Sequence, residues 1–187
     1  MRALILNGSL KEGEQLKELQ DFAVEMLMKS GYAVDKVLLH ERKIAPCLGC
    51  FGCWTRTPGI CVINDAGREL TADIINSDVV VYLTPVTFGG YSSELKKAVD
   101  RIIPLMLPFF EKVQGETHHQ KRYKSYPKVV VLGLMPEADD ELKRIFCDTI
   151  KRNKLNWHGT FLGTAMAVDA SRETIEAVLR EAEVVSC

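Results

Sequence analysis

Four of the six cysteines lie within a single short segment of the chain. Their spacing is Cys47-x2-Cys50-x2-Cys53-x7-Cys61. Two successive two-residue gaps are typical of the compact run that holds a [4Fe–4S] cluster, because short gaps direct three thiolates at one centre. Gly49 and Gly52 each precede a cysteine and allow the backbone to turn its N–H groups toward sulfur. A turn at Pro58-Gly59 would bring Cys61 back as a fourth ligand.

Three other interpretations of the same cysteines stay open. Four thiolates can bind zinc, although zinc sites usually pair two separated Cys-x2-Cys units. A Cys-x2-Cys pair can also lower a thiol pKa and work as a reversible redox pair. The simplest interpretation is a loop of free thiols with no metal. Cys147 falls in a helical pattern and is expected in the core, and Cys187 is the final residue.

Composition and charge set the context for these thiols. The N-terminal apolar stretch is too short for a signal peptide, and the longest apolar run, Ile102–Phe110, contains two prolines and cannot span a membrane. We therefore expect a cytoplasmic protein, where a structural disulfide framework is disfavoured. Lys and Arg number 24 against 25 Asp and Glu, which argues against a diffuse nucleic-acid binder. With 187 residues, we expect one domain, 1–187, with a cysteine-rich insertion at about 44–63.

Short apolar runs alternate with helical patterns along the chain. Strands are expected at 3–6, 32–39, 79–83, 129–133 and 160–168, and helices at 16–30, 65–75, 92–103, 138–151 and beyond a cap at Ser171. Solid apolar strands alternating with helices favour a parallel sheet covered on both faces. The predicted fold is α/β, a flavodoxin-like three-layer sandwich whose five-stranded parallel sheet has the order 2-1-3-4-5.

The loop after the first strand leads into a helix N-terminus, where free N–H groups and the helix dipole favour an anion. Ser9 adds a hydroxyl and Lys11 a positive charge. Neither the P-loop pattern nor Gly-x-Gly-x-x-Gly is present, so a single terminal phosphate, as on FMN, fits best. The simpler interpretation is an ordinary turn in which Ser9 caps the helix.

The loop after the third strand, 84–96, carries glycines and aromatic residues. Gly89 and Gly90 permit a close approach of the backbone to a flat ring, and Phe88 and Tyr91 offer aromatic surface. The simpler interpretation is a Pro/Gly loop with peripheral core aromatics.

These two loops together resemble a known family. Gly-Ser-x-Lys after the first strand and Thr-Pro-Val-x-Phe-Gly-Gly-x-Ser-x-x-Leu-Lys-x-x-x-Asp-Arg at 84–101 resemble the NAD(P)H-dependent FMN reductase superfamily. The run Pro46–Cys53, followed by Cys61 and Asp65, is similar to its iron–sulfur flavoprotein branch. The resemblance covers most of residues 1–101, and 84–101 is its most specific part.

The resemblance implies bound FMN, NAD(P)H or a ferredoxin-type protein as electron donor, and a [4Fe–4S] cluster on Cys47, Cys50, Cys53 and Cys61. The sequence departs from the family pattern at Glu14-Gln15, where Asn-Thr is usual, and at Thr87, where tyrosine is common. By position, the phosphate would contact Ser9, Lys11, Gln15 and Leu16, and the ring would lie beside Pro85, Val86, Thr87, Phe88 and Gly89.

Other segments carry weaker expectations. The basic cluster 118–124 is expected as a solvated loop, with contacts to nicotinamide phosphates as the alternative. The apolar segment 102–110 must be covered, either within the chain or by a second copy, and the resemblance implies a homodimer or homotetramer. Asp100-Arg101 is expected to serve structural ion pairing. No catalytic residue is assigned, because FMN itself performs hydride chemistry.

The resulting hypothesis is an FMN-dependent oxidoreductase that passes electrons from NAD(P)H to a flavin, quinone or other small acceptor. The alternative is an iron–sulfur flavoprotein that carries electrons between protein partners. A third hypothesis is a binding module with a structural zinc loop and no redox role.

Overall fold

The computed structural model describes residues 1–11, 14–167 and 172–182, without the side chains of residues 14 and 15. Its strands are β1 Arg2–Asn7, β2 Ala33–Leu38, β3 Val79–Pro85, β4 Met106–Val113, β5 Glu116–Lys121, β6 Lys128–Met135 and β7 Phe161–Ala167. Its α-helices are α1 Glu14–Lys29, α2 Gly52–Thr55, α3 Ala66–Ile75, α4 Ser93–Asp100, α5 Asp140–Asn156 and α6 Arg172–Glu181, and short 3-10 turns lie at η1 Leu39–Glu41 and η2 Ile103–Leu105. The cap predicted at Ser171 lies outside the described residues.

Five parallel strands form the central sheet in the order β2-β1-β3-β6-β7. The hairpin strands aside, this is the predicted order 2-1-3-4-5, so the fold prediction is confirmed. Asn7 at the end of β1 is paired with Leu83 near the end of β3, and Leu83 with Leu132 of β6. The loops after β1 and β3 therefore leave the same edge of the sheet.

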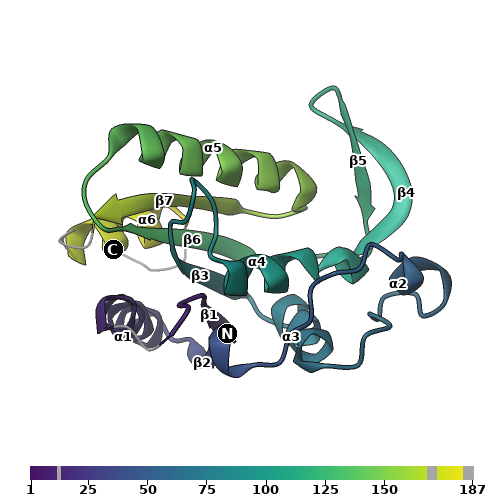
Figure 1. Ribbon diagram of the computed structural model, residues 1–187, viewed down its shortest axis with the longest axis horizontal. Helices are drawn as coiled ribbons and strands as arrows, with labels where there is room; N and C mark the ends of the chain where they lie inside the picture. Colours follow the sequence, from purple (N-terminus) through teal and green to yellow (C-terminus); the bar gives the residue numbers. More distant parts are fainter. Residues whose placement is uncertain (12–13, 168–171, 183–187) are drawn as a thin grey trace.

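Alternate side chains of each central strand enter two separate cores. On one face, Leu4, Tyr82 and Val131 pack with residues of α3, α4 and α5. On the other face, Ile5 and Val81 pack with residues of α1 and α6. Figure 1 shows the sheet between these helices, with α5 along one side and α1 on the other. Burial on both faces explains why these strands are solid apolar runs.

The structure adds a hairpin that the sequence analysis did not predict. Strands β4 and β5 pair antiparallel and stand away from the main sheet, close to α2 (Figure 1). Gln114 and Gly115 form the turn with positive φ angles of 50° and 84°. Phe109 and Phe110 remain 63% and 61% exposed, so the expected cover of the apolar segment is incomplete within this chain.

The expected solvated loop at 118–124 is wrong for its first four residues, which lie in β5. His118 is buried, and its Nδ1 lies 2.9 Å from Asn156 Oδ1. The ring of His119 lies between those of Trp54 and Phe110, with ring-centroid distances of 4.6 and 4.8 Å. Polarity alone suggested a loop, but cross-strand pairing and stacking bury His118 and partly bury His119 and Gln120.

A buried ion pair fixes the ends of the cysteine segment. Arg101 follows α4, is 1% exposed, and its guanidinium binds both carboxylate oxygens of Asp65 at 2.7 and 2.9 Å. The same guanidinium donates to the carbonyls of Ala45 and Ile63, at 2.8 and 3.2 Å. Since residues 45 and 63 lie at opposite ends of the segment, one side chain closes it into a loop.

Asp65 joins the same network from the other side. Its carboxylate accepts hydrogen bonds from the backbone N–H groups of Ala45 and Gly67, the second of which caps α3. Hydrogen bonds from Arg101 are the main reason why the pKa of Asp65 is lowered from its usual value. The expected structural role of Arg101 holds, but its partner is Asp65, whereas Asp100 pairs with Lys96.

Asp65→Asn keeps the helix cap but leaves the buried Arg101 charge unpaired. We expect a loss of about 3–5 kcal/mol of unfolding free energy at neutral pH. Because the folded pKa of Asp65 is lowered, the carboxylate stabilises the wild type above its unfolded pKa of about 4, and this contribution is lost as pH falls through the folded pKa. The deficit of the variant should therefore shrink in acid. Urea unfolding across pH measures both effects.

Asp73→Asn is the matched control, because Asp73 pairs with Arg2 at 3.1 Å at the surface, with 44% of its side chain exposed. This change should lower the free energy of unfolding by less than about 1 kcal/mol. Equal losses for the two variants would contradict the role assigned to the Arg101–Asp65 pair.

Candidate functional site

The predicted phosphate loop lies where β1 leads into α1. Ser9 is buried, and its backbone N–H donates to Asn7 Oδ1 at 2.9 Å. Lys11 is exposed beside it, whereas Leu16 is a core residue of α1. The side chain of Gln15 lies outside the described residues. A hydroxyl, an ammonium group and a helix N-terminus thus gather at one end of the sheet.

His40 was not predicted and lies beside this loop. It sits in η1, directly after β2, and its Nδ1 is 3.4 Å from Ser9 Oγ. The predicted strand order of the sheet could have identified His40 as a neighbour of the Ser9 loop. Because β2 and β1 are neighbours, residues that follow them meet at the same edge.

The predicted ring loop contains a tight turn. Thr87 and Gly90 exchange backbone hydrogen bonds of 3.0 and 2.9 Å around Phe88 and Gly89. Both central residues have positive φ, 49° for Phe88 and 76° for Gly89. This backbone favours glycine or asparagine and is strained for phenylalanine. The Phe88 side chain is nevertheless fully exposed at the tip of the turn, with 104% relative exposure.

Contacts of the other loop residues fix this turn over the end of the sheet. Pro85 ends β3, and the N–H of Val86 donates to Leu134 O of β6 at 2.8 Å. A Cβ on Gly89 would meet Ile145 of α5 at 2.6 Å, so only glycine fits there. Beside Gly90, by contrast, a Cβ would meet a single heavy atom within 4 Å, Thr87 O at 3.8 Å.

The two loops contact each other directly. Ser92 Oγ donates to Gly8 O at 2.5 Å and accepts from Leu95 N, the capping bond of α4. Gly8 lies so close that an added Cβ would approach Leu95 Cβ and Ser92 Oγ to 2.8 Å. The predicted phosphate loop and ring loop therefore form one continuous surface at the carboxyl edge of the sheet.

The cysteine segment forms a second candidate site. Cys47, Cys50, Cys53 and Cys61 all line one small cavity of about 20 Å³. Gly49 has φ of 62°, and its N–H points to Cys47 Sγ at 3.5 Å, as the sequence analysis expected. Gly59 has φ of 86° and donates to Cys53 O at 2.9 Å, which makes the expected return turn toward Cys61.

Burial raises the pKa of the Cys53 thiol, and the neighbouring Cys61, Cys47 and Cys50 sulfurs raise it further. The three other thiols of the segment therefore lie close to Cys53. Among the residues that the structure describes, however, no three His, Cys, Asp or Glu side chains are arranged to hold a metal ion. The geometry thus gives no direct support to the predicted metal.

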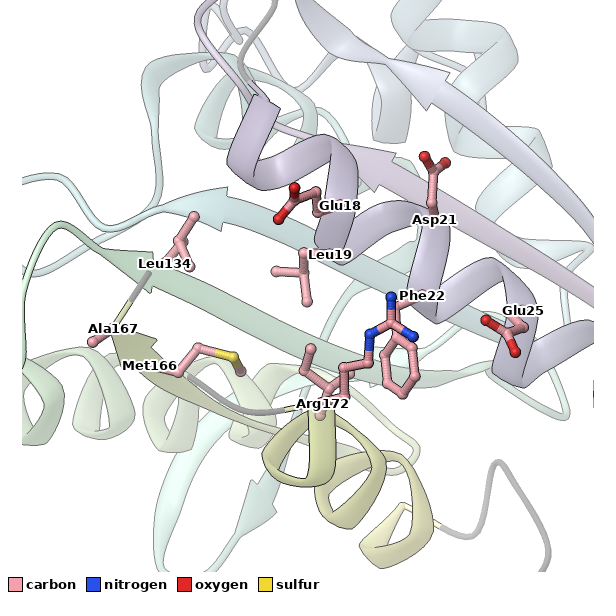
Figure 2. A pocket seen from close by; sticks show the side chains of 10 residues that line it. Glu18, Leu19, Asp21, Phe22, Glu25, Leu134, Met166, Ala167 and Arg172 are labelled. Atoms are coloured by element: carbon pink, nitrogen blue, oxygen red, sulfur yellow. The ribbon is translucent and has the colours of Figure 1, made fainter. Parts of the chain in front are cut away.

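A larger cavity of about 410 Å³ lies on the opposite face, between α1, α6 and the ends of β6 and β7 (Figure 2). Glu18, Asp21 and Glu25 project from α1 at its rim, and Arg172 of α6 lies 5.2 Å from the ring centroid of Phe22. None of the predicted FMN-binding residues whose side chains the structure describes lines this cavity. The FMN prediction therefore rests on the loop surface and not on this cavity.

Within the described ranges, no helix combines the length and the apolar character needed to cross a bilayer.

Comparisons with known proteins agree with the fold. The model of the family NADPH-dependent FMN reductase matches residues 1–122. An iron-sulfur flavoprotein of Methanosarcina thermophila is 29% identical over 105 residues, which are 56% of this chain and 54% of the relative. An iron-sulfur flavoprotein of Archaeoglobus fulgidus is 32% identical over 104 residues, 56% of this chain and 46% of the relative. The chain thus aligns with about half the length of these relatives.

Solved structures show the same architecture. An NAD(P)H:quinone oxidoreductase from Methanothermobacter marburgensis superposes with a TM-score of 0.67 at 13% identity, covering 97% of this chain and 93% of the other. The azoreductase AzrA superposes with a TM-score of 0.65 at 11% identity, covering 97% of both chains. At such identities the likeness shows the fold alone. The family match spans more than half of the chain, including both candidate loops, and the chain belongs to the NADPH-dependent FMN reductase family.

Proposed function

We propose that this chain is an FMN-dependent oxidoreductase that takes electrons from NAD(P)H and passes them to a flavin, a quinone or another small acceptor. The family match supports the flavin and the nicotinamide donor. The observation that carries the proposal further is Phe88, a fully exposed aromatic side chain on a strained backbone at the carboxyl edge of the sheet.

The residues of the first loop fit the phosphate of FMN. Phosphate needs hydrogen-bond donors and positive charge, and the N-terminus of the 16-residue α1 supplies both in part. Ser9 would donate its hydroxyl and Lys11 would supply an ammonium group, with Gln15 and Leu16 at the first turn of the helix. His40, within reach of Ser9 Oγ, would form the side wall of this seat.

The residues of the second loop fit the edge and face of a flat ring. Pro85 ends β3, Val86 and Thr87 follow it, and the open side of Gly90 leaves the backbone accessible. Phe88 would cover the ring. A left-handed conformation at a non-glycine residue costs about 1–3 kcal/mol, and Phe88 adopts it with its side chain fully exposed. We therefore assign this strain to ligand binding.

FMN, when bound, supplies the hydride and electron chemistry itself. The tasks left to this chain are to hold the phosphate, orient the ring against the 85–90 loop and leave one side open to the nicotinamide. No catalytic acid or base is assigned. A cytoplasmic location and a homodimeric or homotetrameric assembly belong to the same proposal, and the exposed Phe109 and Phe110 of the hairpin support self-association.

Phe88→Asn tests the ring assignment. Asparagine tolerates positive φ, so the variant should gain about 0.5–1 kcal/mol of unfolding free energy. It should at the same time bind FMN about tenfold more weakly, because the aromatic cover is lost. FMN titration followed by fluorescence measures the affinity, and NADPH oxidation at saturating FMN measures turnover.

Gln114→Asn provides the matched control. Gln114 has φ of 50° in the β4–β5 turn, next to a glycine, as Phe88 does in its own turn. The control should gain similar stability and leave FMN affinity unchanged. If Phe88→Asn also leaves FMN affinity unchanged, Phe88 is not part of the flavin site.

A second candidate function follows from the spacing of the four cysteines of the segment, all of which line one small cavity. In this alternative the chain carries electrons between protein partners, as an iron–sulfur flavoprotein. Cys47, Cys50, Cys53 and Cys61 would bind a [4Fe–4S] cluster, which supplies one-electron transfer when present. Each cysteine sulfur would bind a different iron of such a cluster, so the four thiols would stand further apart than around a single ion. The names of the two curated relatives support this proposal.

Anaerobic reconstitution with iron and sulfide tests the cluster. The wild type should retain about four iron and four sulfide per chain with broad visible absorption. Cys53→Ala should abolish both, while Cys147→Ala, a cysteine of α5 outside the segment, should retain them. Wild-type protein that retains no iron would leave these residues as thiols and remove the electron-carrier function.

A further inference from the structure

The cysteine segment exposes large apolar side chains. Leu48, Phe51 and Ile60 are 74%, 50% and 51% exposed. Leu48 and Phe51 also line the small cavity that the four cysteines share. A single exposed apolar side chain needs no explanation, but a group of them within one short segment is typical of a surface that another molecule covers.

Phe51 is held rigidly within this surface. Its ring stacks on that of Trp54 in α2, with a centroid distance of 5.1 Å and an interplanar angle of 12°. Trp54 is fixed in turn, because its Nε1 donates to Met106 O at 2.9 Å. The backbone of Phe51 has a φ of 53°, a left-handed conformation that costs about 1–3 kcal/mol at a non-glycine residue. A fixed and half-exposed aromatic ring is a good anchor for a partner, since little side-chain entropy is lost on binding.

The same segment carries an excess of positive charge. Residues 42–64 contain three Lys and Arg and no Asp or Glu, whereas the rest of the chain carries 21 Lys and Arg against 25 Asp and Glu. The next carboxylate along the chain, Asp65, is bound by the buried Arg101. The cysteine segment is therefore a basic region of a chain that is otherwise acidic.

Three arginines place positive charge on the loop between α2 and α3. Arg56 is exposed at the end of α2. The guanidinium of Arg68 donates to Cys61 O at 3.0 Å, and that of Arg122 lies beside Gly59. Within the described part of the chain, none of the three has a carboxylate partner. Their charge is therefore available to an acidic partner.

We propose that this surface docks a segment of a partner protein that combines glutamate or aspartate with apolar side chains. The apolar side chains pack on Phe51 and Leu48, and the carboxylates bind the arginines, because planar guanidinium groups match carboxylates. Aromatic residues and arginine are enriched at protein interfaces, which favours a protein over a nucleic acid or a lipid surface. The docked segment lies beside the cysteine cavity, since Phe51 and Leu48 line it.

The test uses the full chain under reducing conditions and a fluorescein-labelled peptide that repeats Glu-Glu-Phe. Fluorescence anisotropy should show saturable binding, and added salt should weaken it, because salt screens exposed charges. A peptide that repeats Lys-Lys-Phe should not bind. A peptide that repeats Glu-Glu-Ser should bind about tenfold more weakly, because it lacks the apolar contacts.

Phe51→Asn removes the anchor and keeps a residue that tolerates positive φ. It should weaken binding of the Glu-Glu-Phe peptide about tenfold. Phe88→Asn is the matched control, because Phe88 is also an exposed phenylalanine with a positive φ, of 49°, but lies in the ring loop. This control should bind the peptide as tightly as the wild type.

Arg56→Glu reverses one charge of the surface and should weaken the peptide roughly fivefold. Lys36→Glu makes the same change in net charge at an exposed position of β2 and should leave the affinity within about twofold. The comparison separates a local contact from a general effect of net charge.

The proposal is overturned if the Glu-Glu-Phe peptide does not bind, or if Phe51→Asn or Arg56→Glu binds it as tightly as the wild type. It is also overturned if labelled oligothymidylate or phosphatidylglycerol vesicles bind in place of the peptide. A dimer that Phe51→Asn converts into a monomer in analytical ultracentrifugation would overturn it too, because a second copy would then cover the surface. Flavin and iron take part in none of these readouts.

Discussion

The buried pair between Arg101 and Asp65 is the contact on which the placement of the cysteine segment depends. One guanidinium reaches both ends of the segment through Ala45 O and Ile63 O, while the carboxylate caps α3 and binds Ala45 N. Arg101 directly follows α4, whose capping residue Ser92 contacts the phosphate loop. The cysteine cavity and the two candidate flavin loops are thus connected through a single short helix.

The rest of the site depends on backbone geometry more than on polar side chains. Parallel pairing of β1 with β3 brings Gly8 and Ser92 into contact, and glycine at 8 and 89 allows approaches that a Cβ would block. Phe88 is the exception to this use of glycine, since it has a left-handed backbone conformation and its side chain is exposed to solvent. Strain at an exposed aromatic residue next to a candidate cofactor surface is what a binding role would explain.

Sequence reasoning reached the parallel sheet and placed the starts of two helices at 65 and 92, where the structure has the capping residues Asp65 and Ser92, because apolar runs and capping residues act locally. It missed the β4–β5 hairpin. The turn signal Gln114-Gly115 was present, but the flanking strands lack clean apolar alternation, since every side chain of β4 is partly buried or exposed and only His118 is buried in β5. Isolated hairpins of this kind depend on tertiary contacts that no local pattern encodes.

The partner of Arg101 was equally out of reach of local reasoning, because Asp65 and Arg101 are 36 residues apart. His40 and Tyr82 entered only through the structure. His40 becomes relevant because β2 lies next to β1, and Tyr82 is notable because its buried hydroxyl has no hydrogen-bond partner among the described residues. Residue types predicted the two loops and the cysteine cavity, while pairing and burial determined which side chains remain available to a ligand.

The most direct test of the central claim is the visible absorption spectrum of the anaerobically purified chain, supplied with FMN and then with NADPH. An FMN-dependent oxidoreductase should show a protein-bound flavin spectrum that NADPH bleaches and air restores. A protein that stays colourless in the presence of FMN, or a bound flavin that NADPH leaves oxidised, would contradict the proposed function while leaving the fold and the family unchanged.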